Sequence, residues 1–118
     1  MIITYCSETY EECLKKNSPS WGENVFIYSD TSKFGYKMFD PVENMDENLR
    51  RKILVIKNAL TKFRDKNIIF LDADIYLKTS PIKVFENNAD LTVTRMIRRD
   101  RNYDYINSGV TFWRPSKK

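Results

Sequence analysis

The sequence predicts a single α/β domain whose mainly parallel sheet is flanked by helices. Predicted strands and helices alternate along the chain, an order that is typical of parallel sheets. The run Ile68–Leu71 consists of four consecutive apolar residues, the pattern of a strand that is covered on both faces. The 118 residues, of which 42% are apolar, suffice for one hydrophobic core.

The first part of the chain supplies two strands with a helix between them. Ile2–Cys6 is predicted as a strand, and residues 8–16 as a helix with acidic residues near its start and basic residues near its end. Ser18 and the proline after it end this helix. A second strand over residues 24–29 is expected to end at Asp30, where a polar connection begins.

A long helix is predicted next. It begins at Asn44 or Asp46, either of which can cap it, and continues to about Phe63. Apolar residues recur along it at helical spacing and define the face that we expect to pack on the sheet. These residues are Leu49, Ile53, Ile56 and Leu60.

The basic residues of this helix differ in angular position, because successive residues turn by about 100°. Lys57 lies four residues after one of the apolar residues and three before another, so we expect it to border the packed face. Its ammonium group then either reaches phosphates above the sheet edge or extends into water. Arg51 points nearly opposite and is expected to be solvated, and Lys52 and Arg50 are weaker candidates on the flanks.

The last third of the chain carries a further helix, two strands and a basic loop. Ser80 can cap a helix that begins at Pro81. Residues 90–94 and 110–113 are predicted strands. Between them, residues 95–105 form a basic and aromatic loop that fits an acceptor groove or a lid.

Two carboxylates, Asp72 and Asp74, follow the buried strand. Ligands of open α/β sheets bind just beyond the carboxyl ends of such strands. In an extended segment residues two apart point to the same side, so both side chains can approach one cation. Mg²⁺ and Mn²⁺ suit the pair because they prefer oxygen ligands, keep several waters and bind phosphate oxygens. The alternative is that the pair only occupies a turn or caps a helix.

The composition excludes several kinds of chemistry. Histidine is absent, which removes the usual general base, the usual zinc ligand and any Ser/His or Cys/His nucleophile. Catalysis would then rest on carboxylates, a metal or the substrate. The three glycines do not form a Gly-rich phosphate loop. Cys6 and Cys13 are expected to be reduced thiols rather than a disulfide.

Charge and hydropathy limit the partners. The net charge of +4 fits an anionic ligand such as a nucleotide but does not by itself indicate nucleic acid. No stretch approaches the roughly 20 apolar residues of a membrane span, and the first residues lack the pattern of a signal peptide. We therefore expect a cytoplasmic protein, and the sequence leaves homo-oligomers open.

These segments together resemble the nucleotide-sugar-binding half of GT-A-fold glycosyltransferases, of the glycogenin-like and related retaining families. The matching motifs, which span most of the chain, are Thr4-Tyr-Cys-Ser, Ile27-Tyr-Ser-Asp30, Phe70-Leu-Asp-Ala-Asp-Ile75, the following Pro81, and Asn107-Ser-Gly-Val110. The resemblance implies a Rossmann-like GT-A domain over residues 1–118. It also implies transfer of a sugar from a nucleoside diphosphate sugar, expected to be a UDP-sugar, to an acceptor hydroxyl with retention.

The resemblance further implies roles for particular residues. Asp72 and Asp74 would be catalytic, holding Mn²⁺ or Mg²⁺ together with the ribose and diphosphate of the donor. The acceptor is expected to be a carbohydrate or a protein-linked glycan. The residues expected around the donor are Thr4, Tyr5, Cys6, Ser7 and Asp30 at the base, Lys57 and Ala73 at the phosphates or sugar, and Asn107 and Ser108 at the donor sugar.

In the family, a further metal ligand comes from a C-terminal half of about the same size. This ligand is commonly a histidine in a His-x-x-Gly-x-x-Lys-Pro-Trp-type segment, and no such segment occurs in these 118 residues. Two interpretations stay open. The chain is either a fragment of a longer enzyme or a minimal version that binds donor weakly, assembles with a partner or has lost activity.

Functions of other classes also stay open. A nucleotidyltransferase of related fold uses strand-end carboxylates and a metal, but its Gly-rich basic loop is not found after the first strand. A non-catalytic module that binds a nucleotide sugar, or that binds RNA or a polyanion through residues 95–105, is a further alternative. A phosphatase of the haloacid dehalogenase type fits less well, because its Asp-x-Asp is normally followed by Gly-Thr and here by Ile75 and Tyr76.

Overall fold

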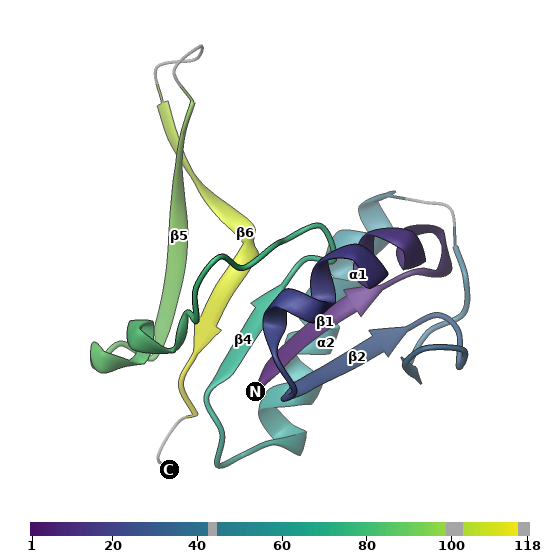
Figure 1. Cartoon of the computed structure of the whole chain (residues 1–118), viewed down its shortest axis with the longest axis horizontal. Helices are drawn as coiled ribbons and strands as arrows, with labels where there is room; N and C mark the ends of the chain where they lie inside the picture. Colours follow the sequence, from purple (N-terminus) through teal and green to yellow (C-terminus); the bar gives the residue numbers. More distant parts are fainter. Residues whose placement is uncertain (43–44, 99–102, 116–118) are drawn as a thin grey trace.

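The computed structural model describes residues 1–42, 45–98 and 103–115, and it shows one α/β domain built on a six-stranded sheet (Figure 1). The strands are β1 (Ile2–Cys6), β2 (Val25–Ser29), β3 (Tyr36–Lys37), β4 (Ile68–Leu71), β5 (Leu91–Arg98) and β6 (Tyr103–Trp113). The described ranges contain the α-helices α1 (Glu11–Asn17) and α2 (Met45–Lys62) and short 3-10 helices at Glu8–Tyr10, Ser18–Trp21 and Ile82–Glu86.

The sheet has the strand order β3-β2-β1-β4-β6-β5. β1 pairs in parallel with both β2 and β4, and β2 pairs in parallel with β3. β6 runs antiparallel to its neighbours β4 and β5. The predicted α/β fold with a mainly parallel sheet is therefore confirmed, and the antiparallel strand β6 is an addition to it.

A hydrophobic core lies on each face of the sheet, under one of the two helices (Figure 1). Successive side chains of a strand point to opposite faces, so β4 contributes to both cores. Ile69 and Leu71 belong to the core on the α1 side, whereas Ile68 and Phe70 belong to the core on the α2 side. This double burial explains why β4 reads as an uninterrupted apolar run.

Only half of the predicted apolar stripe of α2 packs on the sheet: Ile56 is buried and Leu60 packs against the same core, as predicted. Leu49 and Ile53 are 58% and 68% exposed, whereas Val55 and Ala59 are fully buried. The buried face is therefore rotated from the predicted stripe by about 100°, which is one residue of helix. Val55 and Ala59 thus occupy the packed face where Leu49 and Ile53 were expected.

Arg51 lies on the buried face, so the prediction that it is solvated is wrong. It is 4% exposed. Its Nη1 donates to the hydroxyl of Tyr5 at 2.8 Å, its Nη2 donates to the carbonyl of Asp40, and its guanidinium lies 4.8 Å from the ring centroid of Phe39. Hydrogen bonds and an aromatic face stabilise the buried charge. These partners come from distant segments and give no local sequence signal.

The C-terminal third also differs from its prediction. Most of the expected loop over residues 95–105 is strand: residues 95–98 belong to β5 and residues 103–105 to β6, which pair in an antiparallel ladder, while residues 99–102 lie outside the described residues. The ladder projects away from the rest of the sheet (Figure 1). After Pro81 the chain forms the short 3-10 helix Ile82–Glu86 instead of an α-helix.

Both cysteines are free, as predicted. Cys6 is buried, and burial together with the nearby charge of Asp30 raises the pKa of its thiol to about 12. The thiol of Cys6 is therefore protonated near neutral pH and unreactive as a nucleophile. In the part of the chain that the structure describes, neither helix is both long and apolar enough to span a membrane.

Candidate functional site

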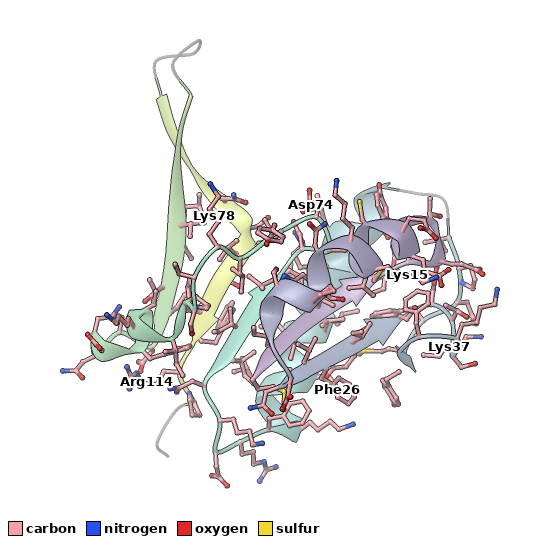
Figure 2. The ribbon with its side chains drawn as sticks, in the orientation of Figure 1. Lys15, Phe26, Lys37, Asp74, Lys78 and Arg114 are labelled. Atoms are coloured by element: carbon pink, nitrogen blue, oxygen red, sulfur yellow. The ribbon has the colours of Figure 1, made fainter. Side chains whose placement is uncertain are left out.

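The candidate site lies at the end of the sheet toward which the parallel strands run. Ser7, Asp30 and Asp72 directly follow β1, β2 and β4. Figure 2 shows Asp74 just beyond the end of β4. This is the edge at which open α/β sheets bind their ligands.

The backbone turns immediately after β4. The N–H of Ile75 donates to the carbonyl of Asp72 at 3.1 Å, and the N–H of Asp72 donates to the carbonyl of Gly109 in β6 at 2.8 Å. The expectation that Asp72 and Asp74 lie in an extended segment is therefore wrong. The strand ends at Leu71, and a turn centred on Ala73 carries both carboxylates.

Lys52 of α2 forms an ion pair with Asp72. Its Nζ lies 2.9 Å from Oδ1 and 3.2 Å from Oδ2 of Asp72, and 3.4 Å from Oγ of Ser108 in β6. The Lys52 side chain is only 16% exposed, and its ammonium lies 5.5 Å from the ring centroid of Phe70. Helix α2, the turn after β4 and strand β6 therefore meet at the carboxylate of Asp72.

Gly109 makes room for this carboxylate. A Cβ atom at residue 109 would lie 2.6 Å from Oδ2 of Asp72 and 3.1 Å from Oδ1 of Asn107. The Asn107 Oδ1 accepts the N–H of Gly109 at 2.9 Å. The β5–β6 register shifts here, since Val93 pairs with Thr111 while Thr94 pairs with Asn107. The bulge brings residues 107–109 against Asp72.

A pocket of about 480 Å³ opens at this end of the sheet. It contains five of the predicted site residues: Tyr5, Ser7, Asp72, Ala73 and Asp74. Six further residues complete its lining: Tyr10, Cys13, Asn48, Leu49, Lys52 and Phe70. A larger pocket of about 630 Å³ lies around Trp21 and Lys66, and none of the predicted site residues lines it.

The other predicted site residues lie around or beneath the pocket. Thr4 and Cys6 are buried in β1. Asp30 is also buried, and its Oδ1 accepts the N–H of Glu8 at 2.8 Å, so it holds the start of the segment that leads to α1. Lys57 is exposed and does not line the pocket, so it lies away from the packed face that it was expected to border. Its exposure agrees with the alternative that its ammonium extends into water.

Sequence reasoning ranked Lys52 too low and missed Asn48. Both line the pocket because they lie on the true packed face of α2. The Oδ1 of Asn48 is buried and has no hydrogen-bond partner within the described part of the chain. Lys52 lies one turn before the buried Ile56, and that spacing was the available signal.

The two carboxylates fit a hard divalent cation that keeps most of its own waters. The described residues include no group of three or more His, Cys, Asp or Glu side chains that could hold a metal. Asp72 and Asp74, which line one pocket, would supply carboxylate oxygens to such a cation, and waters and ligand oxygens would complete its shell. Mg²⁺ and Mn²⁺ bind in this manner together with phosphates.

Fold and site together define an α/β protein with an acidic ligand pocket at the carboxyl ends of its parallel strands. A model of the nucleotide-diphospho-sugar transferase family matches residues 1–118, and the chain belongs to this family. The family match confirms the resemblance to GT-A-type nucleotide-sugar transferases. Comparisons with curated proteins and with solved structures found no match.

Proposed function

We propose that this domain binds a UDP-sugar with Mn²⁺ or Mg²⁺ and transfers the sugar, with retention, to a hydroxyl of a carbohydrate or protein-linked glycan. Membership of the nucleotide-diphospho-sugar transferase family supports this proposal. The observation that carries the finer proposal is the convergence of Asp72, Asp74 and Lys52 on one pocket of about 480 Å³. Carboxylates for a cation and an ammonium for phosphate are the groups that a nucleoside diphosphate requires.

Asp72 and Asp74 hold the cation in this proposal. A cation held there would supply positive charge to offset that of the departing nucleoside diphosphate. Asp72 is oriented from two sides, by Lys52 and by the bulge at Gly109, whereas Asp74 is exposed at the pocket rim. Asp74 is therefore the carboxylate that an incoming ligand meets with less rearrangement.

The remaining lining residues form a less charged part of the pocket. Tyr5, Ser7 and Tyr10 lie at the end of β1 and before α1, and they offer aromatic surface and hydroxyl groups to the base and ribose. The buried Oδ1 of Asn48 is an acceptor available for a donor of the ligand. Ser108, within 3.4 Å of Lys52, marks the side on which the donor sugar would lie.

Retention requires the acceptor hydroxyl to approach the donor on the face from which the diphosphate leaves. These 118 residues contain no histidine, so in this proposal an oxygen of the departing phosphate would take the acceptor proton. The anomeric configuration of the first product, read by NMR, tests this part of the proposal. An inverted product would contradict it.

Calorimetric titration of UDP and UDP-sugars into the chain tests the donor site. We expect binding with Mn²⁺ and little binding with a chelator. Asp74→Asn is expected to abolish the Mn²⁺-dependent part while leaving the fold intact, as checked by circular dichroism. Asp65→Asn, which removes an exposed charge after α2, is the matched control. Equal affinity in the Asp74 variant and the wild type would refute the metal site.

A further inference from the structure

The carboxylate of Asp72 already has a positive partner in the fold. Both of its oxygens lie within hydrogen-bond distance of Lys52 Nζ, at 2.9 and 3.2 Å. The Lys52 side chain is 16% exposed, and the ring of Phe70 covers part of its surroundings. Water therefore screens this ion pair less than it screens a pair on the open surface.

Lys52 and a divalent cation compete for the same oxygens. A carboxylate that ligates Mn²⁺ gives up part of its electron density to the metal, and an ammonium a few ångström away then experiences repulsion. Lys52 must therefore move away from Asp72 when the carboxylate becomes a metal ligand. Its four-carbon side chain has the rotational freedom for such a change, which a planar guanidinium on a fixed ion pair would lack.

The pocket gives the ammonium a second place to bind. Lys52 lines the same pocket as Asp74, Tyr5 and Ser7, so a diphosphate bound there offers acceptor oxygens within reach of a small change in side-chain torsions. Ser108 Oγ, at 3.4 Å from Nζ, provides a polar contact on that side of the pocket. A phosphate is a stronger acceptor for an ammonium than a carboxylate that is shared with a metal.

We propose that Lys52 couples metal binding to donor binding by exchanging Asp72 for the donor diphosphate. This inference rests on the proposed function, and it adds the order and cooperativity of binding. The metal frees the lysine for the diphosphate, and the diphosphate holds the lysine away from the metal ligand. Each ligand therefore raises the affinity for the other by the same factor, because coupling between two sites is reciprocal.

Two measurements on the wild-type chain and on Lys52→Met test the exchange. Mn²⁺ binding without nucleotide is followed by electron paramagnetic resonance of the free ion, and UDP binding with and without Mn²⁺ is followed by calorimetry. Lys52→Met is expected to bind Mn²⁺ alone more tightly than the wild type, on the order of tenfold. It is also expected to lose most of the enhancement of UDP binding that Mn²⁺ produces in the wild type.

Two control variants separate this effect from a loss of charge or of folding. Lys57→Met removes the same charge from the exposed side of α2 and is expected to behave as the wild type. Lys52→Arg keeps a charge beside Asp72 and is expected to keep the weak Mn²⁺ binding of the wild type.

The inference and the proposed function fail in different ways. If the wild type binds Mn²⁺ and UDP but Lys52→Met binds Mn²⁺ no more tightly and keeps the same enhancement, the exchange is overturned and the donor site stands. If the wild type binds no UDP in the presence of Mn²⁺, the proposed function and the coupling are overturned together. In that case tighter Mn²⁺ binding by Lys52→Met would still support the competition at Asp72.

Discussion

Gly109→Ala is the substitution that tests the geometry around Asp72 most directly. The new Cβ would lie 2.6 Å from Oδ2 of Asp72, whereas ordinary van der Waals contact begins at 3.4 Å. The carboxylate must therefore move by about 1 Å, or β6 must shift away from β4. The Asp72 side chain is 36% exposed, so we expect the carboxylate to rotate toward solvent and the strand to stay in place.

The two consequences of this rotation differ in size. Overpacking lowers the free energy of unfolding by about 1–3 kcal/mol where the neighbours cannot move. Because Asp72 is partly exposed and can move, we expect Gly109→Ala to lose about 1 kcal/mol. The ion pair with Lys52 is partly exposed, and its loss adds less than about 1 kcal/mol. A displaced metal ligand matters more for binding: we expect Mn²⁺-dependent UDP affinity to fall by about 10–100-fold.

Urea unfolding measures the first effect and calorimetry the second. Gly22→Ala is the matched control, because Gly22 has φ of 87° and no atom within 4 Å of the added Cβ. An alanine with this backbone conformation lowers the free energy of unfolding by about 1–2 kcal/mol. Residue 22 lies at the pocket around Trp21, away from Asp72, so UDP binding should not change. Wild-type UDP affinity in a folded Gly109→Ala variant would refute the inferred steric role of Gly109.

Two further predictions concern buried groups. Arg51→Leu is expected to lower the free energy of unfolding by about 1–3 kcal/mol, because it leaves a tyrosine hydroxyl and a backbone carbonyl without their donor. Ile53→Ser, at an exposed residue of α2, should lower it by less than about 0.5 kcal/mol in the same urea titration. A larger loss for Ile53→Ser than for Arg51→Leu would mean that Ile53 packs inward, as predicted from the sequence. The pKa of the Cys6 thiol is raised from 9.0 to about 12, so burial favours the protonated thiol, and its contribution to stability is complete below pH 9.0 and is lost as the pH rises toward 12. In the folded chain Cys6 should therefore stay unmodified by iodoacetamide at about pH 8, and its rapid labelling, located by mass spectrometry, would contradict the burial.

Local patterns were sufficient for the elements with a strong one-dimensional signal. β1 and β4 have the predicted boundaries. β4 is an uninterrupted apolar run, which indicates burial on both faces, whereas β1 contains one polar residue, the buried Thr4. Asp72 and Asp74 were predicted because they follow the end of β4, and both line the pocket at that edge. The residues that follow a buried strand in an α/β sheet reach a ligand edge by topology alone.

Several failures depend on packing against other parts of the fold, whereas the turn after β4 and the 3-10 helix after Pro81 are local departures. Two stripes on α2 have helical spacing, and only the sheet decides that Val55 rather than Ile53 packs inward. Because of the rotation of about 100°, Lys52 rather than Lys57 lies beside the pocket, and Lys57 is exposed. Arg51 is buried because Phe39 and Tyr5 surround it, and neither is near it in sequence. The pairing of β5 with β6 depends on a partner strand, which the local composition of residues 95–105 does not reveal.

The backbone hydrogen bond from Asp72 to Gly109 has a consequence for how the protein matures. Lys52 comes from α2, Asp72 follows β4, and Gly109 of β6 lies against the Asp72 carboxylate. This arrangement of side chains therefore exists only after β6 has paired with β4. A chain that emerges during synthesis can form β1, β2 and α1 long before that event. The proposed donor would therefore bind only a chain in which β6 is paired with β4, and its binding would stabilise that pairing.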